Sequence, residues 1–198
     1  MMYLGSMNVF KNINPNSYFT VAMRRGGKFL SVLLAQSGLE AAVVNQAFIV
    51  SSGDRNYISS LEVFLQSNLI DLAQVGCEAL CQAMTSRNQL GINILLTDGR
   101  IDPRQCAGLA RAVQIYQERS LYDNEEGKAY SIVRLIEDGR IDFTVPVWRE
   151  LALRNKVSSS MLVKLETEHR IAREQHEASM RSYPRVCKML YLTASMAC

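Results

Sequence analysis

Apolar residues recur three or four positions apart through the middle of the chain. Leu61 and Leu65 begin this spacing, and it continues as far as Leu80. The period matches one face of an α-helix, because such a helix completes a turn every 3.6 residues. The pattern therefore predicts a long amphipathic helix over residues 57–89, with a break near Gly76.

The same period returns in later segments. One run of apolar side chains shares a helix face and consists of Leu109, Ala112, Val113, Tyr116 and Leu121. Segment 158–182 is highly charged, has apolar residues near a seven-residue spacing, and predicts one long helix that ends before Pro184. Residues 41–50 are almost continuously apolar, which suits either a helix or a buried strand, and the period does not decide between them.

Two stretches about forty residues apart are nearly identical, Leu95–Asp102 and Leu135–Asp142. Both contain Asp-Gly-Arg-Ile-Asp after an apolar helix pattern. Glycine can take the left-handed backbone angles of a helix stop, the isoleucine returns to the core, and the last aspartate caps the next helix. In the first copy Pro103 suits the first helical position. We therefore predict one helix corner used twice, within a duplicated helix-turn-helix hairpin.

The Asp-Gly-Arg-Ile-Asp stretch also resembles the centre of a calcium-binding EF-hand loop. Such a loop needs oxygen ligands at its first and third positions and a glutamate at its twelfth. With Asp98 in fifth place, those positions hold Ile94, Leu96 and Gln105. In the second copy they hold apolar or cationic residues, Arg134, Ile136 and Val145. Because apolar side chains cannot bind a hard cation, we expect no metal here, and no cofactor elsewhere in the chain.

Composition favours helices. The 198 residues include only 4 prolines and 11 glycines, and 48% are hydrophobic, which is enough to fill a core. We expect an all-α protein, a multi-helix orthogonal bundle with the duplicated hairpin and a long C-terminal helix. The expected division is an N-terminal helical segment, 1–56, and a main helical domain, 57–198, or one continuous domain over 1–198.

Charge and cysteine content bear on partners and location. A formal charge of +3 permits contact with nucleic acid or an acidic surface without requiring it. No apolar run approaches the roughly 20 residues that span a bilayer, and the start lacks the pattern of a secretory signal. The chain has five cysteines, and this odd number of thiols would be awkward in an oxidising compartment. We therefore expect a cytoplasmic (intracellular) protein with reduced thiols and no membrane contact.

One segment, residues 149–166, resembles the helix-turn-helix motif of phage-type transcriptional regulators. The matching positions are Leu151, Ala152, Val157, Ser158, Leu162 and Leu165. The resemblance implies that the second helix enters the major groove of DNA. The residues it places near phosphates and base edges are Arg154, Lys156, Ser158, Ser159, Ser160 and Lys164. That family usually has glycine in the turn, whereas this chain has Asn155-Lys156, with the asparagine one place before the usual glycine.

A secondary basic cluster of Arg24, Arg25 and Lys28 surrounds two glycines near the start of the chain. Three cationic side chains beside a flexible turn suit either a solvated loop or a contact with phosphate or RNA. The glycines lack the spacing of a phosphate-binding loop, so we do not expect nucleotide binding there.

The sequence contains no recognisable catalytic set, so we expect a non-enzymatic protein. The leading hypothesis is a nucleic-acid-binding regulatory protein, with DNA or RNA as its partner, that acts as an oligomer. Self-association is expected through the 158–182 helix, whose apolar residues would pair with those of another copy. The alternative is a viral or phage structural or assembly protein that uses its helices for protein–protein contacts only.

Overall fold

A computed structural model describes residues 15–36, 38–119, 125–155, 157 and 159–194, and these residues form helices and connecting turns without a strand. The all-α prediction is therefore confirmed. The α-helices are α1 (Pro15–Arg25), α2 (Gly27–Leu34), α3 (Ala41–Gly53), α4 (Ile58–Gln66), α5 (Leu72–Thr85), α6 (Gln89–Asp98), α7 (Leu109–Arg119), α8 (Glu125–Asp138), α9 (Pro146–Arg154) and α10 (Ser159–Ala194). Two short 3-10 helices are η2 (Arg55–Tyr57) and η3 (Pro103–Gln105).

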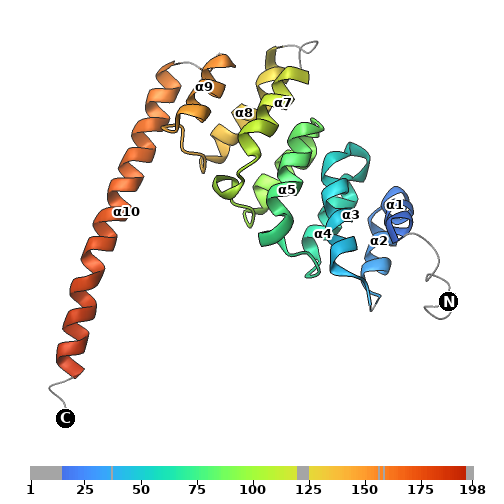
Figure 1. Cartoon of the computed structure of the whole chain (residues 1–198), viewed down its shortest axis with the longest axis horizontal. Helices are drawn as coiled ribbons and strands as arrows, with labels where there is room; N and C mark the ends of the chain where they lie inside the picture. The colour runs from blue at the N-terminus through green and yellow to red at the C-terminus, as the bar shows by residue number, and fades with distance from the viewer. Residues whose placement is uncertain (1–14, 37, 120–124, 156, 158, 195–198) are drawn as a thin grey trace. The chain divides into compact units, whose positions relative to one another are not determined.

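The chain divides into two compact units, Met1–Ile141 and Asp142–Cys198. Unit 1 holds α1 to α8, and unit 2 holds α9 and α10 (Figure 1). The boundary expected near residue 56 lies inside unit 1, between α3 and α4, which pack on each other.

Unit 1 consists of helical hairpins arranged in two layers. The first helices of successive hairpins pack on one another in the order α1, α3, α5, α7, and the second helices follow as α2, α4, α6, α8 (Figure 1). Each hairpin also closes on itself, because α1 contacts α2, α3 contacts α4, α5 contacts α6 and α7 contacts α8. This layered order differs from the orthogonal bundle that we expected, which is not confirmed.

The predicted helix over 57–89 is two helices, α4 and α5, and the chain turns between them. Asp71 ends the turn, because its Oδ1 accepts a hydrogen bond from the backbone N–H of Gln74 in the first turn of α5. Gly76 lies inside α5 rather than at the break. A Cβ added there would stand 2.7 Å from Cγ1 of Ile101. The glycine therefore permits a close approach and does not interrupt the helix.

The ambiguous segment 41–50 belongs to helix α3. This helix packs against α1, α4 and α5, so apolar residues are needed around most of its circumference. Val44, Phe48 and Ile49 are all buried although they do not share one face. Burial on several sides removes the helical period from the sequence and explains why the pattern could not distinguish a helix from a strand.

Buried polar groups connect three helices of unit 1. The Ser52 hydroxyl at the end of α3 donates to the carbonyl of Ala79 in α5 at 2.8 Å. The Asn88 amide nitrogen donates to the carbonyl of Ser52 at 2.8 Å, and its Oδ1 accepts from the N–H of Gly91 at 3.2 Å. A Cβ on Gly91 would lie 2.6 Å from the Ser52 carbonyl oxygen, so only glycine fits at that contact. The network fixes α6 against α3 and α5.

In unit 2, α9 packs on α10, and Arg149 pairs with Glu166 across them at 3.1 Å. Helix α10 runs for 36 residues and passes through Pro184, so the prediction that it ends before this proline is wrong. Proline removes one backbone hydrogen bond and bends a helix without necessarily ending it. In the described part of the chain, α10 and the shorter helices all fall below the length or apolarity that crossing a membrane requires.

Candidate functional site

The first Asp-Gly-Arg-Ile-Asp stretch forms the corner between α6 and η3. Helix α6 ends at Asp98, and Gly99 follows in the left-handed conformation with a φ of 77°. Ile101 is buried, and Asp102 caps η3 through a 3.0 Å hydrogen bond from the N–H of Arg104. Pro103 occupies the first position of η3. The corner that the sequence predicted is confirmed at each of these positions.

The second copy repeats this local structure at the end of α8. Gly139 has a φ of 75°, and Ile141 is buried. Asp142 accepts a 2.9 Å hydrogen bond from the N–H of Thr144, and Pro146 begins α9. Because the backbone angles and the aspartate bond match the first copy, the two stretches are the same kind of corner.

Arginine side chains form ion pairs with the carboxylates that a calcium-binding loop would use as ligands. Arg100 binds Asp98 through two nitrogens at 2.7 Å each, and Arg140 binds Asp138 at 2.7 and 2.6 Å. The hydrogen bonds from Arg100 hold the pKa of Asp98 below its usual range, although burial opposes them. Each pair closes a two-residue loop around the corner glycine and keeps the guanidinium in a fixed orientation.

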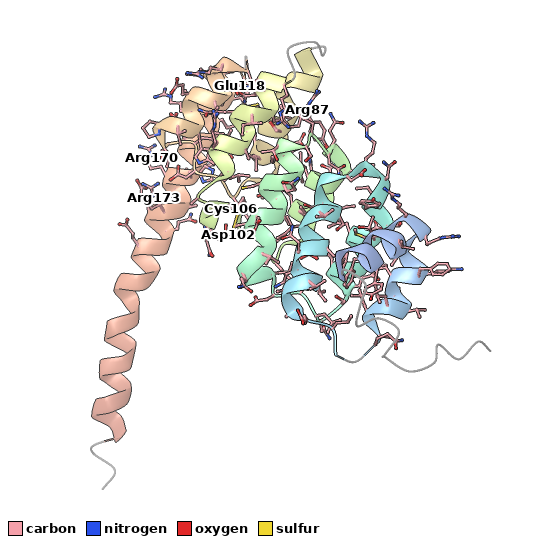
Figure 2. The ribbon with its side chains drawn as sticks, turned by 45° about the vertical axis from the view of Figure 1, so that its right-hand side comes forward. Arg87, Asp102, Cys106, Glu118, Arg170 and Arg173 are labelled. Atoms are coloured by element: carbon pink, nitrogen blue, oxygen red, sulfur yellow. A yellow bond between two sulfur atoms is a disulfide. The ribbon has the colours of Figure 1, made fainter. Side chains whose placement is uncertain are left out.

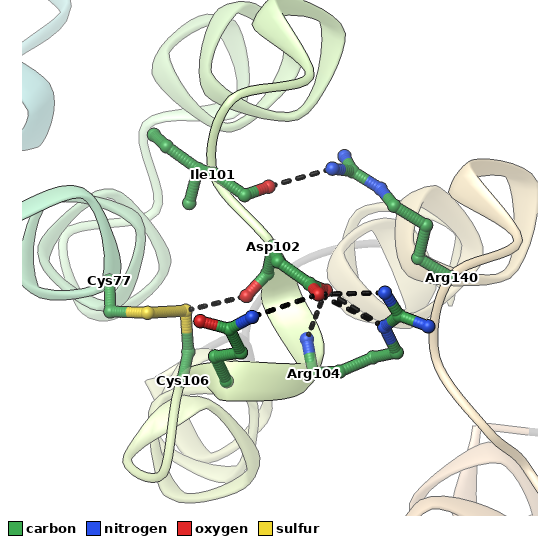
Figure 3. The surroundings of a disulfide bond; sticks show 7 residues. Cys77, Ile101, Asp102, Arg104, Cys106 and Arg140 are labelled. Carbon is green, nitrogen blue, oxygen red and sulfur yellow. Dashed lines mark hydrogen bonds and ion pairs between the residues drawn. A yellow bond between two sulfur atoms is a disulfide. The ribbon is translucent and has the colours of Figure 1, made fainter. Parts of the chain in front are cut away.

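The oriented arginines then bind the preceding hairpin. Arg140 donates to the carbonyl of Leu96 at the end of α6 at 2.9 Å. It also donates to the carbonyl of Ile101 in the first corner at 2.7 Å (Figure 3). Arg100 donates to the carbonyl of Leu65 near the end of α4 at 2.6 Å. The last carbonyls of a helix lack partners within it, so each corner arginine satisfies acceptors on its neighbour. The sequence reasoning missed this role.

A disulfide joins Cys77 of α5 to Cys106 beside the first corner (Figure 3). The expectation of reduced thiols is therefore wrong for these two residues. The disulfide links positions that are 29 residues apart in the sequence and anchors the first corner to α5. Disulfides are typical of oxidising compartments, and the expected cytoplasmic location stays a prediction.

Cys81 lies one turn after Cys77 and is a free thiol. Burial raises its pKa, and the negative charge of Glu78 adds to the effect. A raised thiol pKa leaves little reactive thiolate near neutral pH. Among the residues that the structure describes, no three His, Cys, Asp or Glu side chains are grouped so that they could hold a metal ion.

The nucleic-acid contacts expected on α9 and α10 are only partly described. Lys156 and Ser158 lie outside the described residues, and Ser159 is described only as the start of α10. Ser160, Arg154 and Lys164 are exposed. The last two are already paired within their helices, Arg154 with Glu150 and Lys164 with Glu168 at 3.9 Å. Their charge is therefore partly neutralised on the surface that was expected to meet phosphate.

The packing between α9 and α10 partly matches a helix-turn-helix. Leu151, Ala152 and Leu162 are buried, as the resemblance implies, but Leu165, which it also places at a buried position, is only half-buried. Two further features differ. Asn155 has a φ of −94°, so it does not take the left-handed conformation usual in that turn. The second helix is also 36 residues long, far longer than one major groove accommodates.

The secondary basic cluster lies around the turn between α1 and α2. Arg24, Arg25 and Lys28 are all exposed. The Arg24 side chain donates to the hydroxyl of Tyr57 at 3.4 Å, which directs it toward η2. Arg25 and Lys28 make no ion pair with the described residues. These two cations are therefore available to a partner.

A hollow of about 380 Å³ on unit 2 is lined by Thr144, Val163, Glu166, Thr167, Arg170 and Arg173. Figure 2 shows Arg170 and Arg173 on α10. Arg173 forms an ion pair with Asp142. Burial alone would raise the pKa of Asp142, but hydrogen bonds from Thr144 and the charge of Arg173 outweigh it, so this pKa is lowered. With Glu166 also present, the lining of the hollow contains charges of both signs.

Comparison of the chain with protein-family models, with curated proteins and with solved structures finds no match in any of the three. A function is therefore inferred from the surfaces of the molecule itself. They are the two exposed basic regions, the free length of α10 and the apolar side chains at the first hairpin.

Proposed function

We propose that this chain is a non-enzymatic scaffold that binds other protein chains through exposed helix surfaces and associates with itself through α10. The observation that carries the proposal is the exposure of α10. Between Arg170 and Ala178, every side chain that the structure describes is exposed. Most helical stability in proteins comes from packing an apolar face, so a helix of this length gains stability from a partner.

The sequence of α10 suits a second copy of itself as that partner. Leu165, Ala172 and Ser179 are seven residues apart, which is the repeat of a coiled coil. Leu162 and Leu165 begin this stripe where α10 packs on α9, and the stripe continues along the free part of the helix. The face of α10 that packs on α9 is therefore continued by an exposed residue, Ala172, further along the same helix.

Replacement of Ala172 by aspartate tests this association. We expect the full chain to sediment as a dimer, and Ala172→Asp to weaken dimerisation at least tenfold, because it places like charges opposite each other at the interface. Ala178→Asp is the matched control, since Ala178 is also exposed but lies about 240° away around the helix. A monomeric parent chain at high concentration, or equal effects of both variants, contradicts the proposal.

Nucleic-acid binding is the second candidate function, and the distribution of charge favours it. Residues 142–198 contain nine Lys and Arg against six Asp and Glu, whereas residues 1–141 contain thirteen of each. The whole net charge of the chain therefore belongs to unit 2. A local excess of positive charge is the minimum that phosphate binding requires.

A mobility-shift titration with duplex DNA and with RNA tests this second candidate. If unit 2 binds nucleic acid, the affinity falls steeply as salt rises, and replacement of Lys156 and Lys164 by glutamate abolishes the complex while the circular dichroism spectrum is retained. An unchanged affinity in the double variant removes these residues as the contact site. No complex at low salt removes the candidate altogether.

A further inference from the structure

The first hairpin of unit 1 has an uncovered side. Hairpins α3–α4 and α5–α6 have neighbours before and after them, whereas α1 packs on α3 and α2 packs on α4 with no other described hairpin beyond them. Phe29 and Val21 are the most exposed large apolar side chains in the described part of the chain, at 61% and 59%, and Val32, which lies in α2 with Phe29, is 54% exposed.

Helix geometry places these side chains on the outward side. Gly27 faces α4, where a Cβ would stand 3.0 Å from Cγ2 of Val63. At about 100° per residue, Phe29 lies about 200° from Gly27 around α2 and therefore points away from α4. In α1, Val21 lies about 200° from the buried Phe19. We call Val21, Arg25, Lys28, Phe29 and Val32 the end face.

The charged residues of α1 and α2, the two helices that carry these side chains, are all basic. The sequence has no aspartate or glutamate before Glu40, and it contains four basic residues in that stretch. Arg25 and Lys28 are exposed beside the apolar side chains and are not paired with described residues. A complementary partner therefore combines an apolar stripe with acidic borders.

We propose that the end face binds an amphipathic α-helix of another protein whose apolar stripe is bordered by Asp and Glu. Interior hairpins of unit 1 are covered by helices on this same side, so a partner helix would continue the existing layers. An anionic bilayer also combines apolar and acidic character. However, the end face offers only three large apolar side chains, at the end of a helix stack, which favours a helix as the occupant.

The inference rests on the proposed role in protein contacts, but not on association through α10, so the two can fail separately. The test uses the full chain and two labelled 18-residue helical peptides that share one leucine stripe. One peptide has glutamates beside the stripe, and the other has lysines. We expect the glutamate peptide to bind at least tenfold more tightly at low salt, with a preference that shrinks as salt rises.

Variants locate the binding surface. We expect Phe29→Glu to weaken glutamate-peptide binding at least tenfold, and Leu90→Glu, an exposed position on α6, to leave it unchanged. Replacing Arg25 and Lys28 by glutamate should reverse the preference to the lysine peptide. Equal binding of the two peptides, or equal effects of Phe29→Glu and Leu90→Glu, overturns the proposal.

Three further measurements distinguish other occupants. A bilayer is the occupant if the chain co-sediments with anionic vesicles, Phe29→Glu abolishes that binding, and neither peptide binds. A loss of dimerisation in Phe29→Glu would make a second copy the occupant. Binding of the glutamate peptide only after removal of residues 1–14, and not to the full chain, would make the chain's own first segment the occupant. Each of these results overturns the proposal, and their absence with peptide binding supports it.

Discussion

Replacing Asn88 by alanine is expected to lower the free energy of unfolding of unit 1 by about 3 kcal/mol. The Asn88 side chain is buried, and its amide makes two hydrogen bonds, to the carbonyl of Ser52 at 2.8 Å and from the N–H of Gly91 at 3.2 Å. Alanine leaves a buried acceptor in α3 and an N–H in the first turn of α6 without partners. An unpaired buried polar group costs about 1–3 kcal/mol, and a lost helix cap about 1 kcal/mol.

Asn88→Ser separates these two contributions. Serine keeps an oxygen that can accept from Gly91 but loses the donor to Ser52, so we expect a smaller loss of about 1–2 kcal/mol. Chemical unfolding should be followed by far-ultraviolet circular dichroism, because the single tryptophan, Trp148, belongs to unit 2 and does not report on unit 1. If alanine and serine cost the same, the Ser52 bond carries the whole effect and the cap contributes nothing.

The turn before α5 and the hydrogen bonds of Asn88 show why part of the fold was not predictable. The apolar period predicted helix across residues 57–89 and gave no sign of a break before α5, because the apolar spacing runs on through the turn. The partner of Asn88 is Ser52, 36 residues earlier. A polar residue within an apolar pattern shows that a bond is needed, but not which distant group supplies it.

The helix corners were predictable because their chemistry is local. A glycine in the left-handed conformation, a buried isoleucine and a capping aspartate all lie within four residues, so the local amino-acid sequence determines the geometry of the corner. The targets of Arg100 and Arg140 were not predictable, because their carbonyl partners lie 35 and 39–44 residues earlier. The disulfide between Cys77 and Cys106 is non-local in the same way.

The expected nucleic-acid site contains a local signal of another kind. Glu150 and Arg154 are four residues apart, as are Lys164 and Glu168, and this spacing places each pair side by side on a helix. The exposure of Arg154 and Lys164 followed from the amphipathic pattern. The same spacing in the sequence predicts that the charges of Arg154 and Lys164 are partly neutralised, which weakens the interpretation that these residues bind phosphate.

Replacing Arg140 by alanine is expected to lower the free energy of unfolding of unit 1 by about 2–3 kcal/mol. The side chain of Asp138 is only 8% exposed, and Arg140 is its ion-pair partner. The same guanidinium donates to the carbonyls of Leu96 and Ile101. Alanine thus leaves a largely buried carboxylate without its cation and at least two carbonyls without a donor. Arg100→Ala is the matched control at the first corner.

The two corners differ in burial, and this difference determines the expected order of effects. The Arg100 side chain is 51% exposed and donates to one carbonyl, whereas that of Arg140 is 25% exposed. Water can replace most of what Arg100 supplies, so its loss should cost less than about 1 kcal/mol. Arg140→Lys keeps the charge but lacks the planar fork that binds a carboxylate and carbonyls together. If lysine restores full stability in chemical unfolding, charge alone explains the corner and the carbonyl bonds contribute nothing; we expect it to recover less than half of the loss.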